Sequence, residues 1–118
     1  SMSSNVFGVS FDARDANRVA TFWAATLGGT VTAGGSSENA VVQAPNGTPS
    51  GLRIGFHAVP EDKAVKNRMH FDLITTEFAA ELERLIGLGA TTLNEVRNGA
   101  HWVTLGDPEG NEFDLIDG

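Results

Sequence analysis

The sequence contains one pattern twice, and this repetition constrains the fold more than any other feature. Residues 6–31 read as an alternating strand, an amphipathic helix and then Leu-Gly-Gly-Thr. Residues 69–92 read as a strand, a helix and then Leu-Gly-Ala-Thr. Each copy closes on a proline-glycine turn signal, at residues 44–47 and 107–111. A repeat of this kind predicts two copies of one supersecondary unit, with a site to be sought between them.

The spacing of apolar residues predicts the elements of each copy. Asp15 is predicted to cap a helix that runs to Leu27, and Thr76 a second helix. Their apolar stripes are Ala16, Val19, Ala20, Trp23 and Leu27 in the first, and Phe78, Leu82, Leu85 and Ile86 in the second. Apolar-polar alternation or flanking turn signals predict strands at residues 5–12, 30–33, 39–43, 52–58, 69–75, 91–97, 100–105 and 111–117.

These elements define an α+β fold of two tandem βαβββ modules. We predict a single domain over residues 5–118, with module one at 5–58, a polar linker at 59–68 and module two at 69–117. Alternating strands suit sheets that are covered by a helix on one face only. The uncovered faces collect Gly8, Ser10, Arg53, His57, His70, Asp72 and Asp114. If the mixed sheets curve toward each other, these residues line a cleft.

Composition excludes several classes of function. The chain has no cysteine, which excludes disulfides, thiolate catalysis and cysteine-bound zinc. Its net charge of −7 argues against a nucleic-acid partner, whose phosphates require clusters of Lys and Arg. No apolar stretch is long enough for a membrane helix, and the sequence is compatible with a cytoplasmic location. Neither a phosphate-binding glycine loop nor a nucleophile elbow is present.

Three segments carry a resemblance to a known superfamily. They are DPEGNEFDL at residues 107–115, VPEDK with KNRMHFDL at 59–73, and FW followed by LG at 22–28. With these segments the chain resembles the vicinal-oxygen-chelate superfamily, also called the glyoxalase/bleomycin-resistance/dioxygenase fold. The second segment is similar to glyoxalase-like proteins that are common in actinobacteria. The resemblance extends from Val6 to Asp117 and implies the fold, whereas one fold hosts many chemistries.

The resemblance also implies a set of metal-ligand positions. In metal-using members, four ligands come from the first and last strands of the two modules. Gly8 stands where a histidine or glutamine is usual, while His70 matches the equivalent position in the second module. Asp114 falls at the place of the usual glutamate, and alternation turns His57 toward the cleft. The resulting set of His57, His70 and Asp114 suits Fe, Mn, Ni or Zn as a divalent ion.

A metal-free site is the alternative, because Gly8 removes one ligand and His70 can instead bond to Asp72 or Asp114. The sequence-based candidates for substrate binding are Arg53, Asp72 and Trp102, whereas His101 is expected near the tip of the last hairpin.

The sequence leaves two main functions open, and a regulatory ligand sensor is a third interpretation. One is a glyoxalase-like, metal-dependent lyase, isomerase or dioxygenase that acts on a small molecule. The other is a metal-free protein that resembles bleomycin-resistance proteins and sequesters a cationic or aromatic small molecule. In both cases the resemblance implies a homodimer with C2 symmetry.

Overall fold

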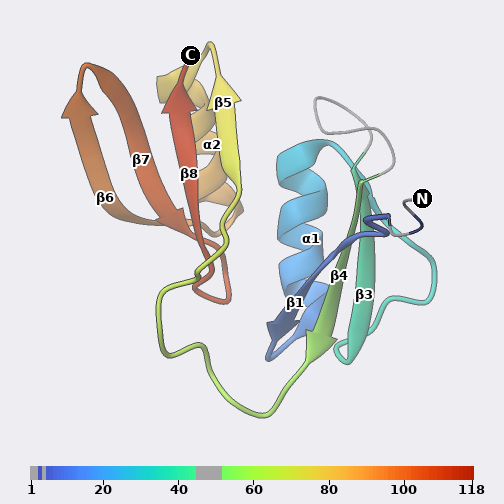
Figure 1. Ribbon diagram of the computed structural model, residues 1–118. Coiled ribbons are helices and arrows are strands. Elements are labelled where there is room, and N and C mark those ends of the chain that lie inside the picture. Colours follow the sequence, from blue (N-terminus) through green and yellow to red (C-terminus); the bar gives the residue numbers. More distant parts are fainter. Residues whose placement is uncertain (1–2, 4, 45–51) are drawn as a thin grey trace. The chain divides into compact units, whose positions relative to one another are not determined.

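The computed structural model describes residues 3, 5–44 and 52–118, so the predicted turn at residues 45–47 lies outside the described residues. The chain forms two compact units, Ser1–Asp62 and Lys63–Gly118. Each unit contains a four-stranded sheet and one helix, which confirms the two predicted βαβββ modules (Figure 1). Among the described residues, no helix has the length and apolar character that crossing a membrane requires.

The first unit packs helix α1 on one face of its sheet. Its elements are β1 (Val9–Ala13), α1 (Ala16–Leu27), β2 (Thr30–Val31), β3 (Asn39–Ala44) and β4 (Leu52–Ala58). The strand order is β1-β4-β3-β2; β1 and β4 are parallel, and the other neighbours are antiparallel. Alternation buries Ile54 and Phe56 on the helix side. Arg53, Gly55 and His57 consequently belong to the uncovered face.

Helix α1 begins and ends as the sequence predicts. Asp15 is the N-cap, and its carboxylate accepts a hydrogen bond from the backbone N–H of Arg18 at 3.1 Å. Gly28 is left-handed, with φ 67°, and ends the helix. Val19 and Trp23 from the predicted stripe are buried against the sheet. This unit therefore has its core between α1 and β1, β3 and β4.

The second unit repeats the arrangement. Its elements are β5 (Asp72–Thr75), α2 (Phe78–Leu88), β6 (Thr91–Asn98), β7 (Ala100–Gly106) and β8 (Glu112–Asp117), in the order β5-β8-β7-β6. Strands β5 and β8 are parallel, as are β1 and β4 in the first unit. The residues with the least exposure are Leu85, Val103, Leu105, Phe113 and Leu115. Their strand positions leave residues 102, 104, 114 and 116 on the uncovered face.

Three local predictions in the second unit are wrong. Strand β5 begins at Asp72 rather than at residue 69, so His70 lies on the irregular segment before it. Thr76 does not cap α2; the N-cap is Glu77, whose N–H donates to Thr75 Oγ1 at 3.0 Å. Ile86 is 47% exposed, because each residue advances about 100° round a helix and Ile86 turns away from the sheet that buries its neighbour Leu85.

Candidate metal site on the second unit

Three potential metal ligands meet at the paired strands β5 and β8. Asp72 and Asp114 are direct neighbours in the parallel ladder, and His70 lies two residues before Asp72. His70 Nδ1 is 3.0 Å from Asp72 Oδ1 and 3.7 Å from Asp114 Oδ2. One donor atom from each residue lies within 4.8 Å of the others. The second unit thus brings one imidazole and two carboxylates together without any residue of the first.

Asp114 is the most firmly held of the three. Its Oδ1 accepts a hydrogen bond from Thr104 Oγ1 at 2.5 Å, across the antiparallel pair of β7 and β8. Its backbone N–H donates to the carbonyl of Phe71 at 3.0 Å, next to His70. The Asp114 side chain is 19% exposed, against 54% for Asp72. Such support from a neighbouring hydroxyl orients a carboxylate and leaves its second oxygen available.

The chemistry of these donors fits a divalent cation. Carboxylate oxygens and imidazole nitrogen are the groups that bind ions such as Mn, Fe and Zn. Among the described residues, no Lys or Arg forms an ion pair with Asp72 or Asp114. Two ionised carboxylates that share a site repel each other, and a divalent ion would offset that repulsion. Three protein ligands would leave coordination positions open for a substrate.

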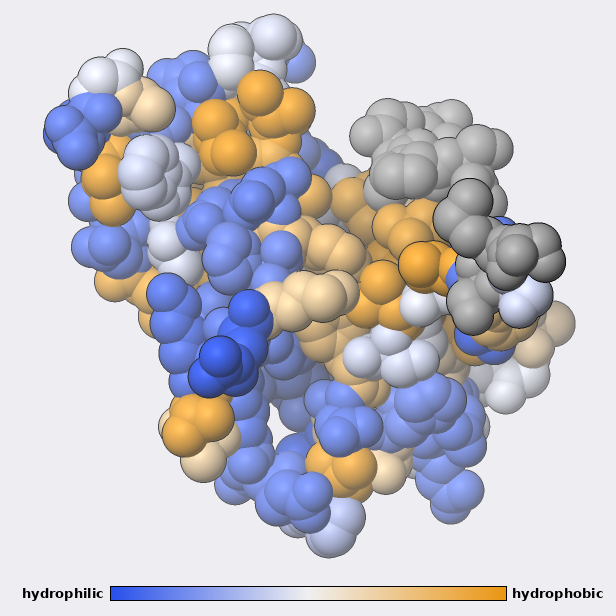
Figure 2. Space-filling model, in the orientation of Figure 1, coloured by the Kyte–Doolittle hydropathy of each residue, from blue (hydrophilic) through white to orange (hydrophobic). Residues whose placement is uncertain are grey.

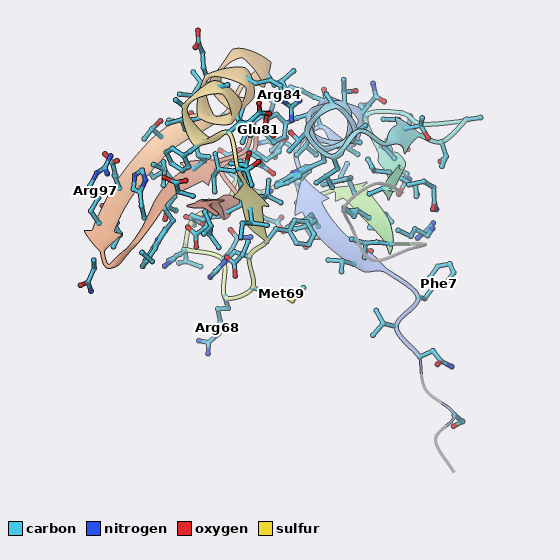
Figure 3. The ribbon with its side chains drawn as sticks, turned by 90° about the horizontal axis from the view of Figure 1, so that it is seen from above. Phe7, Arg68, Met69, Glu81, Arg84 and Arg97 are labelled. Carbon is cyan, nitrogen blue, oxygen red and sulfur yellow. The ribbon has the colours of Figure 1, made fainter. Side chains whose placement is uncertain are left out.

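The segment before His70 is tied to the start of β8. Asn67 N–H donates to Glu112 Oε1 at 2.9 Å, and Lys63 Nζ lies 3.0 Å from the same carboxylate. Burial is the largest influence on Glu112 and raises its pKa. The hydrogen bonds from Asn67, Lys63 and the backbone N–H of Glu112, together with the positive charge of Lys63, outweigh burial, so the pKa of Glu112 is lowered from its ordinary value. Figure 3 shows Arg68 and Met69 projecting from the same segment.

Apolar groups adjoin the carboxylates on this uncovered face. Trp102, a predicted substrate-binding residue, is half-buried on β7 and pairs with Ile116 of β8. Ile74, two residues beyond Asp72, is 72% exposed. Apolar patches alternate with hydrophilic ones over the unit that contains β5 to β8 (Figure 2). A small molecule held here would meet both apolar and charged groups.

The predicted site residues of the first unit lie on its own uncovered face. His57 is exposed on β4, with Nδ1 2.8 Å from Asn39 Oδ1. The Arg53 guanidinium lies 4.8 Å from the ring centroid of Phe7. His57 and Arg53 therefore remain sequence-based candidates beside the group of His70, Asp72 and Asp114.

Gly8 has no room for a side chain. A Cβ at this position would lie 2.6 Å from the backbone oxygen of Arg53, closer than such atoms approach. Gly8 lies immediately before β1 and packs by its backbone against Arg53 of β4. This packing leaves no room at Gly8 for the metal-binding side chain that the resemblance implies at this position.

His101 belongs to a different cluster, on the helix-covered face of the second sheet. Its ring lies 4.4 Å from that of Phe78 on α2, and its nitrogens are 2.7 Å from Glu95 Oε2 and 3.2 Å from Asp117 Oδ2. The hydrogen bond to His101 is the main reason why the pKa of Glu95 is lowered. The position two residues beyond Gly99 agrees with the expectation that His101 lies near the hairpin tip.

Sequence reasoning missed one feature of the site. The contact of His70 with Asp72 was anticipated from the sequence, and the assignment of Asp72 to substrate binding stays a prediction. Thr104 carried no sequence signal, because its contact with Asp114 depends on the register between β7 and β8.

The duplicated units define the class of protein: this is the fold of the glyoxalase/bleomycin-resistance/dioxygenase, or vicinal-oxygen-chelate, superfamily. Residues 8–116 match the family model of the glyoxalase-like domain, and the chain belongs to that family. No curated protein matches the chain. The resemblance to actinobacterial members stays a prediction.

Solved structures share the fold at low sequence identity. A mutant of the fosfomycin resistance protein FosX from Listeria monocytogenes, complexed with Mn(II) and 1S,2S-dihydroxypropylphosphonic acid, is 17% identical with a TM-score of 0.75, over 99% of this chain and 92% of that one. A glyoxalase/bleomycin resistance protein/dioxygenase family enzyme from Burkholderia phytofirmans PsJN is 22% identical, with a TM-score of 0.71 over 96% and 98%. Oxidase ChaP-H2 is 19% identical, with a TM-score of 0.67 over 98% and 94%.

Proposed function

We propose that this chain is a metal-dependent enzyme that acts on a small molecule, with His70, Asp72 and Asp114 as ligands of a divalent cation. The observation that carries the proposal is the approach of their donor atoms to within 4.8 Å. The Mn(II) in the FosX complex supports it, since that protein has the same fold. This ligand set differs from the one that the sequence indicated, which was His57, His70 and Asp114. Asp72 takes the place of His57, and His57 remains a further candidate.

Several residues of the second unit would have distinct roles at such a site. A bound divalent ion would act as a Lewis acid on a substrate oxygen, as in the lyase, isomerase and dioxygenase chemistries of the superfamily. Thr104 holds Asp114 in place through its hydroxyl. Trp102 and Ile74 offer apolar contact to the part of the substrate that does not react. The most exposed ligand, Asp72, lies where a substrate would reach the ion from solvent.

Metal analysis of variants tests this proposal. The protein is stripped with a chelator, reconstituted with Mn(II) and subjected to elemental analysis. We expect about one ion per chain in the wild type and loss of that ion in His70→Ala and Asp72→Asn. Asp62→Asn is the matched control, since Asp62 is an exposed carboxylate paired with Arg14 in the other unit. Persistent absence of metal from the reconstituted wild type would refute the proposal.

The variant His57→Ala tests the set proposed from sequence. Retention of the ion would exclude His57 as a required ligand, whereas its loss would add His57 to the set. In either case the result for Asp72→Asn decides whether the second unit supplies three ligands.

A metal-free binding protein is the second candidate, and the packing at Gly8 favours it. Without a metal, two carboxylates beside Trp102 suit a cationic or aromatic molecule. Bleomycin is the probe: we expect quenching of tryptophan fluorescence by the chelator-treated protein and loss of that quenching in Trp102→Phe. Quenching that persists in Trp102→Phe would exclude this site.

We also propose a homodimer, as in other members of the superfamily. Size-exclusion chromatography with light scattering should give twice the 12.4 kDa of one chain. A species of single-chain mass alone would contradict a dimer.

A further inference from the structure

His70 lies on a segment without regular structure, yet that segment is tied to β8 on both sides of it. Residues 63–71 form neither helix nor strand. On one side, Asn67 N–H donates to Glu112 Oε1 at 2.9 Å. On the other, the carbonyl of Phe71 accepts from Asp114 N–H at 3.0 Å. His70 is therefore held between two attachments to the strand that carries Asp114.

Glu112 is the centre of the first attachment. Its carboxylate is 16% exposed and pairs with Lys63 Nζ at 3.0 Å, while Lys63 is 22% exposed and also donates to the carbonyl of Val65 at 2.5 Å. Asn67 Nδ2 adds a bond to Asn111 Oδ1 at 3.1 Å. Because these groups are largely shielded from water, their interactions are screened less than those of a surface ion pair. The network orders five residues that would otherwise have few contacts with the sheet.

We propose that Glu112, together with Lys63 and Asn67, is a positioning residue of the metal site. This inference rests on the proposed function, because it assigns the network a role toward the ion that His70, Asp72 and Asp114 would bind. A metal site requires its ligands within about 0.5 Å of the correct geometry. Only one of the three ligands, His70, lies outside a strand, and the network supplies the order that the strand gives to Asp72 and Asp114.

A second explanation must be separated from positioning. Glu112 carries a negative charge two residues from Asp114, so it could attract a cation by charge alone. The variant Lys63→Met distinguishes the two effects. It removes a positive charge, and therefore a purely electrostatic role predicts tighter binding. Positioning predicts weaker binding, because the variant loosens the segment.

The experiment measures the dissociation constant of Mn(II) by electron paramagnetic resonance on the full chain. Partners outside the ligand shell typically change metal affinity by about 10- to 100-fold, so we expect a loss of about 10-fold or more in Glu112→Ala. Glu112→Gln keeps an acceptor for Asn67 N–H and should retain part of the affinity. Lys63→Met should bind more weakly than wild type.

Glu81→Gln is the matched control. Glu81 also forms an ion pair in this unit, with Arg84 on α2 (Figure 3). Arg84 is the side-chain partner that the described residues give Glu81, and none of the three ligands is among its partners. We expect this variant to bind Mn(II) as the wild type does. Wild-type affinity in Glu112→Ala, or tighter binding in Lys63→Met, would overturn the inference while the metal site itself stands.

A second readout does not depend on the metal. Backbone ¹⁵N order parameters of residues 69–71 should fall in metal-free Glu112→Ala and remain unchanged in Glu81→Gln. Failure of the wild type to bind Mn(II) would refute the proposed function and the role toward an ion. Unchanged order parameters would separately show that the network does not hold the segment.

Discussion

Replacement of Gly8 by alanine should destabilise the first unit. The added Cβ would lie 2.6 Å from the carbonyl oxygen of Arg53, whereas ordinary contact begins at 3.4 Å, so the backbone must move by 3.4 − 2.6 = 0.8 Å. That movement would disturb the parallel ladder of β1 and β4, which begins at the pair Val9 and Ile54. Overpacking of this kind costs about 1–3 kcal/mol. The lower entropy of the unfolded chain offsets about 0.4–1 kcal/mol of this cost, so the midpoints of the two ranges leave a net destabilisation of about 1.3 kcal/mol.

Urea denaturation followed by circular dichroism measures this loss as a lower midpoint with an unchanged slope. Gly87→Ala is the matched control, because Gly87 lies within α2 and a Cβ there meets nothing within 4 Å. We expect the control to gain about 0.5–1 kcal/mol from the higher helix propensity of alanine. A Gly8→Ala variant as stable as the wild type would refute the packing argument. It would also reopen this position to a metal ligand.

Three further predictions concern the site and the two cores. Thr104→Val should weaken Mn(II) binding by about 10- to 100-fold, because Asp114 loses the hydroxyl that orients it. Thr92→Val, at an exposed position of β6, is the control, and equally weakened binding in this variant would contradict the prediction. The hydrogen bond from Arg84 chiefly lowers the pKa of Glu81, so this pair stabilises the fold at neutral pH and is lost as pH falls through the lowered pKa. Glu81→Gln should therefore lower the free energy of unfolding by about 0.3–0.5 kcal/mol at neutral pH and by much less at acidic pH, where Glu81 is protonated in both the folded and the unfolded chain. Denaturation at both pH values measures this, and an equal effect at both would exclude the ion pair as the cause. Trp23→Ala should lower the free energy of unfolding by about 3–5 kcal/mol, as measured by calorimetry, because Trp23 is only 1% exposed. A loss below about 1 kcal/mol would contradict its place in the core.

The sequence predicted the elements well because their signals are local. Asp15 and Gly28 cap α1, and alternation assigned the faces of β4 and β8. The cap of α2 was not predicted correctly. Thr76 has the right side chain for a cap, yet the helix begins after Glu77, whose N–H donates to Thr75 Oγ1.

The candidate site was predicted only in part because its assembly depends on register. His70 and Asp114 followed from spacing and resemblance. The approach of Asp72 to Asp114 requires the parallel pairing of β5 with β8, which no single strand reveals. The same holds for Glu112, whose proposed role rests on its bonds to Asn67 and Lys63, which its own strand does not reveal.

Anomalous diffraction from crystals grown with Mn(II) would show directly whether the second unit binds a divalent ion. We expect a peak at about 2.0–2.3 Å from donor atoms of His70, Asp72 and Asp114. A peak that excludes Asp72, or the absence of any peak at these residues in crystals of the reconstituted protein, would contradict this expectation.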